Sequence, residues 1–188
     1  MAEWSELLAE LVEARGTELN RYGFLLCGDR AEGADLFQDA LVRVFTHPKG
    51  GWTVRDVEGY VRRTMLNRYL DLYRRRHRLR LLLPRLSGGG QSEVVPDHGE
   101  GADRRLDLLA AIGDLTPRQR ACVVLRFYED LPVAEVAHRM RLSQGTVKRH
   151  LSDATARMFA RMSESRPDHP PAADGDASSA HASTGGTR

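Results

Sequence analysis

The segment from Leu131 to Met158, LPVAEVAHRMRLSQGTVKRHLSDATARM, has the pattern of two short helices joined by a tight turn. Apolar residues spaced three and four apart predict one helix from about Pro132 and a second after Ser143. Ser143 suits the N-cap of the second helix, because its hydroxyl can accept the amide of Thr146 or Gly145. Three residues of the second helix then face inward: Val147, Leu151 and Ala154. The segment therefore predicts a helix-turn-helix.

The outward face of this second helix is polar and basic, and it carries Gln144, Thr146, Lys148, Arg149 and Ser152. A helix-turn-helix places the second helix in the major groove, with its N-terminal residues near base edges. Lysine and arginine suit phosphate or guanine, and glutamine suits adenine. An ordinary helical hairpin with a solvated basic face is the alternative. The net charge of +5 over residues 118–162 favours DNA binding.

The rest of the 188-residue chain is also predicted to be helical. Apolar periodicity predicts three helices in residues 1–83 and four in residues 105–162, and no stretch alternates as a strand does. Gly28 suits a helix C-terminus, and Thr116 before Pro117 suits a helix N-terminus. Glycine and proline are dense in residues 84–104, which predicts a flexible linker. Residues 163–188 lack large apolar side chains after Met162, which predicts a disordered tail. The fold class is therefore all-α, with two small helical domains.

The net charge of +2 hides two basic blocks within acidic surroundings. The net charge is −5 for residues 1–59, +8 for 60–86, −4 for 87–117, +5 for 118–162 and −2 for 163–188. This distribution indicates a polyanionic partner at two places. Apolar runs are too short for a transmembrane helix, and the acidic N-terminus is unlike a signal peptide, so we expect no membrane insertion.

The two cysteines, Cys27 and Cys122, stand 95 positions apart. Such isolated cysteines predict neither a disulfide framework nor a zinc site, and we expect two buried thiols in a reducing cytoplasm. No phosphate-binding glycine loop, metal-ligand spacing or nucleophile–base pair is recognisable, so we expect no catalytic residues, no metal and no cofactor. The sequence therefore predicts a protein that is not an enzyme.

The segment from Tyr60 to Arg76 interleaves aromatic residues, arginines and one asparagine, Asn67. Arginines neutralise phosphates, aromatic rings stack on unpaired bases, and an asparagine can hydrogen-bond an extruded base. This combination suits single-stranded or melting DNA better than a closed duplex. The alternative is a core helix with buried tyrosines and solvated arginines.

Several motifs together resemble the RNA polymerase sigma factors of the extracytoplasmic-function (ECF) type. Asp35-Leu36-Phe37-Gln38-Asp39 matches an element of their region 2, and Asn67, Asp71 and Arg74-Arg75-Arg76 match the asparagine, aspartate and arginine cluster that follow it. Three further matches are to region 4: Leu115 to Arg120, Glu135-Val136-Ala137, and Ser143-Gln144-Gly145-Thr146-Val147-Lys148. The resemblance covers roughly residues 20–162, with the linker where the family has one.

The resemblance implies a role for each block. Core polymerase would be bound through its β′ clamp and β flap, with four residues at the clamp: Asp35, Leu36, Gln38 and Asp39. The −10 element would be bound by Arg62, Arg63, Asn67, Arg68, Tyr69, Arg74, Arg75 and Arg76, with the loop 47–56 bordering the base pocket. The −35 element would be bound by Ser143, Gln144, Thr146, Lys148, Arg149, His150 and Ser152.

The expected function is promoter-specific transcription initiation. Core polymerase and promoter DNA are the expected partners, and an anti-sigma protein is a possible further one. Promoter melting is expected to be driven by the capture of unpaired bases. A free-standing helix-turn-helix regulator of duplex DNA is the alternative, although it leaves residues 35–39 and 67–76 without a role. Three residues depart from the family pattern: Arg141 replaces a common glycine, and Asp153 and His150 replace frequent arginines. Arg141 would cost about 1 kcal/mol if its backbone is left-handed, and Asp153 would weaken −35 binding.

Overall fold

The computed structural model describes residues 2–46, 51–82 and 100–164, and the regular structure within these ranges is entirely helical. The first half holds three helices: α1 (Ala2–Cys27), α2 (Arg30–Phe45) and α3 (Val54–Leu82). The second half holds α4 (Glu100–Gly113), α5 (Pro117–Val123), a π-helical turn η1 (Val124–Tyr128), α6 (Val133–Met140) and α7 (Gln144–Glu164). The prediction of an all-α chain with three and then four α-helices is confirmed.

The helix ends follow the local chemistry that the sequence predicts. Gly28 has a positive φ of 78° and donates its amide to the carbonyl of Phe24 at 2.7 Å, which closes α1. Thr116 and Gln119 form a capping box at the start of α5, with Pro117 in its first turn. Ser143 Oγ accepts the amide of Thr146 at 3.1 Å and so begins α7. Each end therefore satisfies backbone groups that a helix leaves unpaired.

Two glycines set how closely α1 and α2 pack. A Cβ atom at Gly23 would lie 2.4 Å from the carbonyl oxygen of Gly33, and a Cβ atom at Gly33 would lie 2.5 Å from the amide nitrogen of Phe24. The backbones therefore touch where neither residue has a side chain. This contact brings the carboxylates of α2 within reach of the arginines of α3, which packs against both helices.

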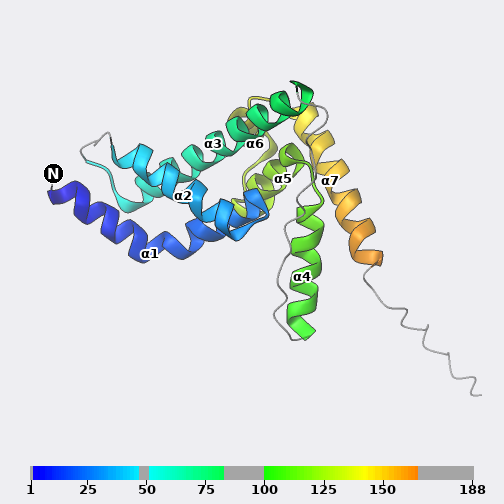
Figure 1. Cartoon of the computed structure of the whole chain (residues 1–188), viewed down its shortest axis with the longest axis horizontal. Coiled ribbons are helices and arrows are strands. Elements are labelled where there is room, and N and C mark those ends of the chain that lie inside the picture. Colours follow the sequence, from blue (N-terminus) through cyan, green and yellow to red (C-terminus); the bar gives the residue numbers. More distant parts are fainter. Residues whose placement is uncertain (1, 47–50, 83–99, 165–188) are drawn as a thin grey trace, which may run out of the picture.

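The two halves share one hydrophobic core. The same buried cluster includes Leu26 of α1 and Met65 of α3 together with Cys122, Leu125 and Val147 of the second half. In Figure 1, α1, α2 and α3 lie together, α5 packs beside them, and α4 and α7 extend away from the first half. The second half is therefore held against α1 and α3 mainly through α5.

The observed helix boundaries differ from the predicted linker and tail in two places. α4 begins at Glu100, inside the predicted linker 84–104, because a single glycine such as Gly101 costs a helix only about 1 kcal/mol. α7 ends at Glu164, two residues inside the predicted tail 163–188. Residues 83–99, residues 165–188 and residues 47–50, which the sequence predicts as part of a loop, lie outside the described residues. The division into domains therefore stays a prediction.

Neither cysteine is oxidised: Cys27 is half-buried, Cys122 is buried, and both are free thiols. Burial raises the pKa of Cys27 to about 12 and that of Cys122 to about 11, so both remain protonated at neutral pH. Across the described ranges, every helix is too short or too polar to cross a membrane.

Candidate nucleic-acid interface

The predicted polymerase-binding residues lie on α2. Asp35, Gln38 and Asp39 are exposed, and their spacing of three and four places them on one face of the helix. Leu36, by contrast, is 3% exposed and belongs to the hydrophobic core. Leu36 therefore anchors α2 to the hydrophobic core, and the surface available to a partner consists of the three polar residues.

The predicted −10 residues of α3 lie in several different surroundings. Arg63 and Asn67 are exposed, whereas Tyr69 is 8% exposed and packs in the core. Burial raises the pKa of the Tyr69 hydroxyl above its ordinary value, so this group stays protonated. Tyr69 therefore contributes to packing in this arrangement, as the alternative interpretation of the tyrosines expected.

Arg62 lies inside the junction between the halves. Its guanidinium donates two hydrogen bonds to Glu58, at 3.0 and 2.8 Å, and lies 5.2 Å and 5.5 Å from the ring centres of Tyr22 and Tyr128. Burial alone would lower the pKa of Arg62, but its contacts with Glu58 raise the pKa above the ordinary value. Cation–π contacts of this kind stabilise the junction. Arg62 is therefore occupied, although the sequence placed it on the DNA-binding face.

Three further arginines of α3 are held by carboxylates. Arg68 contacts Asp39 at 3.1 Å, which joins a predicted −10 residue to a predicted polymerase-binding residue. Arg76 makes two hydrogen bonds to Glu32 of α2, at 3.3 and 2.9 Å, and Arg74 contacts Asp71 at 2.9 Å. All three are exposed or half-exposed, so each contact contributes little to stability and can be exchanged for another anion.

The predicted −35 residues open α7. Gln144, Lys148, Arg149 and Ser152 are exposed, as the helical pattern predicts, and Thr146 is half-buried beside its cap. Lys148 and Arg149 make no ion pair with any described residue. Their charges are therefore available to phosphate or to base edges in a major groove.

His150 differs from its neighbours on α7. It is half-buried, and its Nε2 is enclosed without a hydrogen-bond partner among the described residues. Burial and the nearby positive charge of Arg118 lower its pKa, which keeps the imidazole neutral at pH 7. His150 is therefore partly enclosed by the body of the protein, unlike the exposed residues Lys148 and Arg149 beside it.

The turn of the helix-turn-helix has the geometry that makes Arg141 costly. Arg141 adopts left-handed backbone angles, φ 54° and ψ 46°, and its amide closes the last turn of α6. Leu142 N then donates to Ala137 O at 2.9 Å, which completes the helix end. Ala137 and Val147 are buried where the two helices meet. The motif is therefore formed with an arginine at a position that favours glycine.

Arg120 is a buried residue whose role the sequence pattern did not reveal. Its guanidinium donates to the carbonyls of Ile112 (3.0 Å) and Gly113 at the end of α4. It also donates to the carbonyls of Leu26 (3.3 Å) and Cys27 (2.7 Å) at the end of α1. One cation thus satisfies the C-termini of two helices, where the helix dipole favours positive charge.

An aromatic pair strengthens the same junction. The rings of Tyr22 and Tyr128 stack with centroids 6.1 Å apart, and the Tyr128 hydroxyl donates to Glu18 O at 3.3 Å. The π-helical turn η1 carries Tyr128 inward, whereas Phe127 is left 62% exposed. Sequence periodicity could not find this junction, because the residues that make these contacts across it are at least 66 positions apart in the chain.

Comparisons with known proteins agree with this geometry. Residues 111–160 match the family model "Sigma-70, region 4", which spans the helix-turn-helix. The chain is 34% identical over 149 residues to the RNA polymerase sigma-E factor of Streptomyces avermitilis, covering 79% of this chain and 81% of that protein. It is 29% identical over 147 residues to the ECF RNA polymerase sigma factor SigL of Mycobacterium tuberculosis, covering 77% and 82%.

A solved structure has the same fold. The sigma factor RpoE of Bartonella quintana, in complex with the anti-sigma factor NepR, superposes with a TM-score of 0.63 at 18% identity, covering 88% of this chain and all of that one. The two sequence relatives match this chain over about four fifths of their own length. This chain also has the helix-turn-helix with its caps and the basic helix α3. The chain belongs to the RNA polymerase sigma factors of the ECF type.

Proposed function

We propose that this sigma factor binds core RNA polymerase through α2, the −10 element through α3 and the −35 element through the start of α7. The observation that carries the proposal is the placement of three exposed polar surfaces on one helical framework: residues 35–39, residues 63–76 and residues 144–152. Because core polymerase acts in the cytoplasm, we place the protein there. It carries no catalytic step of its own, and promoter melting draws on the free energy of base capture.

Transcription from a cognate promoter tests the proposal as a whole. The full chain is added to core polymerase purified from its own organism, and RNA is measured from genomic fragments. Promoter-dependent transcripts whose start sites share −10 and −35 sequences are expected. Binding to duplex DNA without any promoter-dependent RNA would instead identify a free-standing helix-turn-helix regulator.

The polymerase-binding face is tested by charge reversal. Asp35→Arg is expected to lower the affinity for core polymerase about tenfold, because a like charge replaces the complementary one at the interface. Glu13→Arg is the matched control, since Glu13 is an exposed acid of α1 outside the proposed face. Equal affinities of the two variants, measured by fluorescence anisotropy with labelled sigma factor, would contradict the assignment of α2.

The −10 surface is tested at Asn67. Asn67→Ala is expected to reduce promoter opening about tenfold, measured by permanganate reactivity of unpaired thymines, while core affinity stays unchanged. Asn20→Ala provides the control, because Asn20 is an exposed asparagine of α1 whose side-chain amide donates to Gly16 O of the same helix. Loss of core binding by the Asn67 variant would refute this role.

The −35 surface is tested at Lys148 and Arg149. Replacing either by alanine is expected to weaken binding to −35 duplex, with a shallower dependence on salt, because one phosphate contact is lost. Arg157→Ala, further along α7, serves as the comparison. An unchanged footprint over the −35 element would show that another element reads it.

Simultaneous contact with both promoter elements requires the two halves to separate. The elements lie 25 positions apart, which is about 85 Å along B-form DNA at 3.4 Å per base pair. Yet Asn67 lines the same cavity as Arg141 and Leu142 in the turn before α7. We infer that binding to core polymerase breaks the contacts of Arg120 and Tyr128 with the first half. The Bartonella relative is bound by an anti-sigma factor, and we propose that a protein of that class holds this chain too.

A further inference from the structure

Two adjoining cavities lie along the junction between α3 and the second half, with volumes of about 750 Å³ and 340 Å³. They share four lining residues: Asp71, Tyr73, Arg74 and Arg118. Together they form one groove, which we call the junction groove. Cavities of these sizes match small-molecule ligands.

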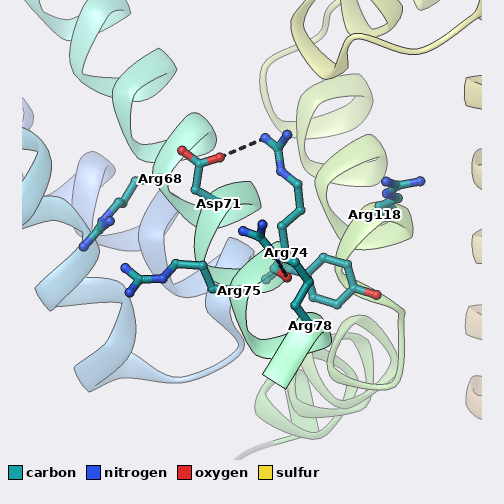
Figure 2. A pocket seen from close by; sticks show the side chains of 7 residues that line it. Arg68, Asp71, Arg74, Arg75, Arg78 and Arg118 are labelled. Atoms are coloured by element: carbon teal, nitrogen blue, oxygen red, sulfur yellow. Dashed lines mark hydrogen bonds and ion pairs between the residues drawn. The ribbon is translucent and has the colours of Figure 1, made fainter. Parts of the chain in front are cut away.

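The junction groove is lined by arginines from both halves. Figure 2 shows Arg68, Arg74, Arg75 and Arg78 on α3 and Arg118 on the neighbouring helix α5. Arg139 and Arg141 of α6 line the smaller cavity. Asp71 is the one carboxylate among the described lining residues, so the groove is strongly electropositive.

The arginines of the junction groove differ in their ion pairs with the described residues. Arg68, Arg74 and Arg139 are paired with Asp39, Asp71 and Glu129. By contrast, Arg75, Arg118 and Arg141 make no ion pair with any described residue. Positive charges gathered from different helices repel one another until an anion lies between them. The unpaired guanidinium groups therefore point to a multiply charged anion that contacts both halves at once.

The two cavities differ in chemistry along the length of the junction groove. The larger cavity has Arg75, Arg78 and Arg118, whose planar forks suit phosphate oxygens. The smaller one also has four arginines, Arg74, Arg118, Arg139 and Arg141, and it adds three apolar side chains, Leu70, Met140 and Leu142, with a single amide, Asn67. Apolar side chains and one amide suit the face and the polar edge of a nucleobase. The groove thus has arginines for phosphate along its whole length, and the smaller cavity adds groups that suit a base.

We propose that the junction groove binds a nucleoside polyphosphate, with its phosphates among the arginines of the larger cavity and its base in the smaller one. The ligand contacts α3, α5 and α6 together, so it stabilises the arrangement in which the halves are packed. A ligand that binds one arrangement lowers the population of the other. If α3 binds the −10 element as the proposed function states, the nucleotide competes with promoter DNA for Asn67 and Arg74.

The test measures binding of a fluorescent N-methylanthraniloyl derivative of GTP to the full chain by anisotropy. Arg118→Gln is expected to weaken binding about tenfold, because a charge-assisted contact that links the halves is lost. Arg157→Gln is the matched control, an exposed arginine of the second half outside the groove, and its affinity should stay unchanged. Thermal unfolding of both variants verifies that each remains folded.

Inorganic tripolyphosphate identifies the part played by the base. It is expected to displace the nucleotide only at concentrations about tenfold higher, since it leaves the smaller cavity empty. Equal competition by tripolyphosphate would overturn the base end of the proposal. Absence of nucleotide binding, or equal losses in the Arg118 and Arg157 variants, would overturn the site.

The proposed function is measured separately from this site. Arg118 lies outside the predicted −10 and −35 residues, so promoter opening by Arg118→Gln in nucleotide-free buffer should equal that of the unaltered chain. In the unaltered chain, added GTP should reduce −10 single-strand binding, and the Arg118 variant should resist that reduction. If the unaltered chain binds the nucleotide and still opens promoters equally well with and without it, the proposed competition with promoter DNA is refuted, whereas the nucleotide site itself is not.

Discussion

The basic helices α3 and α7 present their positive charge in different ways. In α3, four arginines contact carboxylates of the first half: Arg62, Arg68, Arg74 and Arg76. At the start of α7, Lys148 and Arg149 are exposed and make no ion pair with any described residue. The net charge of a segment therefore does not measure the charge that is free to bind DNA. These four arginines of α3 must exchange a carboxylate for a phosphate, whereas the start of α7 displaces only counter-ions.

The difference follows from where each helix lies. α3 packs against both α1 and α2, so its long side chains reach Glu32, Asp39 and Glu58. The first turns of α7 follow the turn at Arg141, and the Lys148 and Arg149 side chains there make no ion pair with any described residue. We infer that the carboxylates screen α3 until polymerase and promoter replace them, while α7 needs no such release.

The largest expected effect comes from Arg120, whose guanidinium donates to the C-terminal carbonyls of both α1 and α4. Arg120→Ala leaves buried carbonyls of α1 and α4 unpaired, and we expect it to lower the free energy of unfolding by about 3–5 kcal/mol. Arg118→Ala, an exposed arginine two positions earlier, should change it by less than about 0.5 kcal/mol. Urea denaturation followed by circular dichroism measures both. Equal effects would show that Arg120 does not hold the junction.

The contact between α1 and α2 is expected to have the next largest effect. A methyl group at Gly23 would lie 2.4 Å from the backbone oxygen of Gly33, so Gly23→Ala forces the helices apart. We expect a loss of about 1–3 kcal/mol in the free energy of unfolding. Gly59→Ala is the control: no atom lies within 4 Å of its added Cβ, and it should stabilise α3 by about 0.5–1 kcal/mol. A stable Gly23 variant would mean that this close approach does not position the carboxylates of α2.

The sequence predicted the features that depend on neighbours in the chain. The caps at Gly28, Thr116 and Ser143 each use residues within four positions, so their chemistry is visible in the sequence. The partners of Arg62 and Arg120 are different, because Tyr128 and Cys27 come from the other half of the chain. The spacing of apolar residues along the sequence does not reveal contacts between residues so far apart in the chain. For that reason the two basic helices were identified correctly, while the arginines that are already occupied were not.

The turn before α7 is expected to give a smaller effect of opposite sign. Arg141 has a left-handed backbone, which glycine adopts without strain. Arg141→Gly should therefore raise the free energy of unfolding by about 0.5–1 kcal/mol. Thermal unfolding measures the gain, and −35 duplex affinity measures whether α7 keeps its orientation. A less stable variant would show that contacts of the Arg141 side chain outweigh the backbone strain.

The smallest expected change in stability tests the comparison between the helices most directly. Asp39→Asn removes the partner of Arg68, and since Asp39 is exposed and Arg68 half-exposed, the free energy of unfolding should change by less than about 0.5 kcal/mol. Single-stranded −10 DNA should nevertheless bind about two- to fivefold more tightly at low salt, because Arg68 becomes free for phosphate. Asp153→Asn changes the net charge equally but lies on α7, and should leave single-strand affinity unaltered. If both variants gain equally, overall charge governs binding, and the carboxylates of α2 do not screen α3.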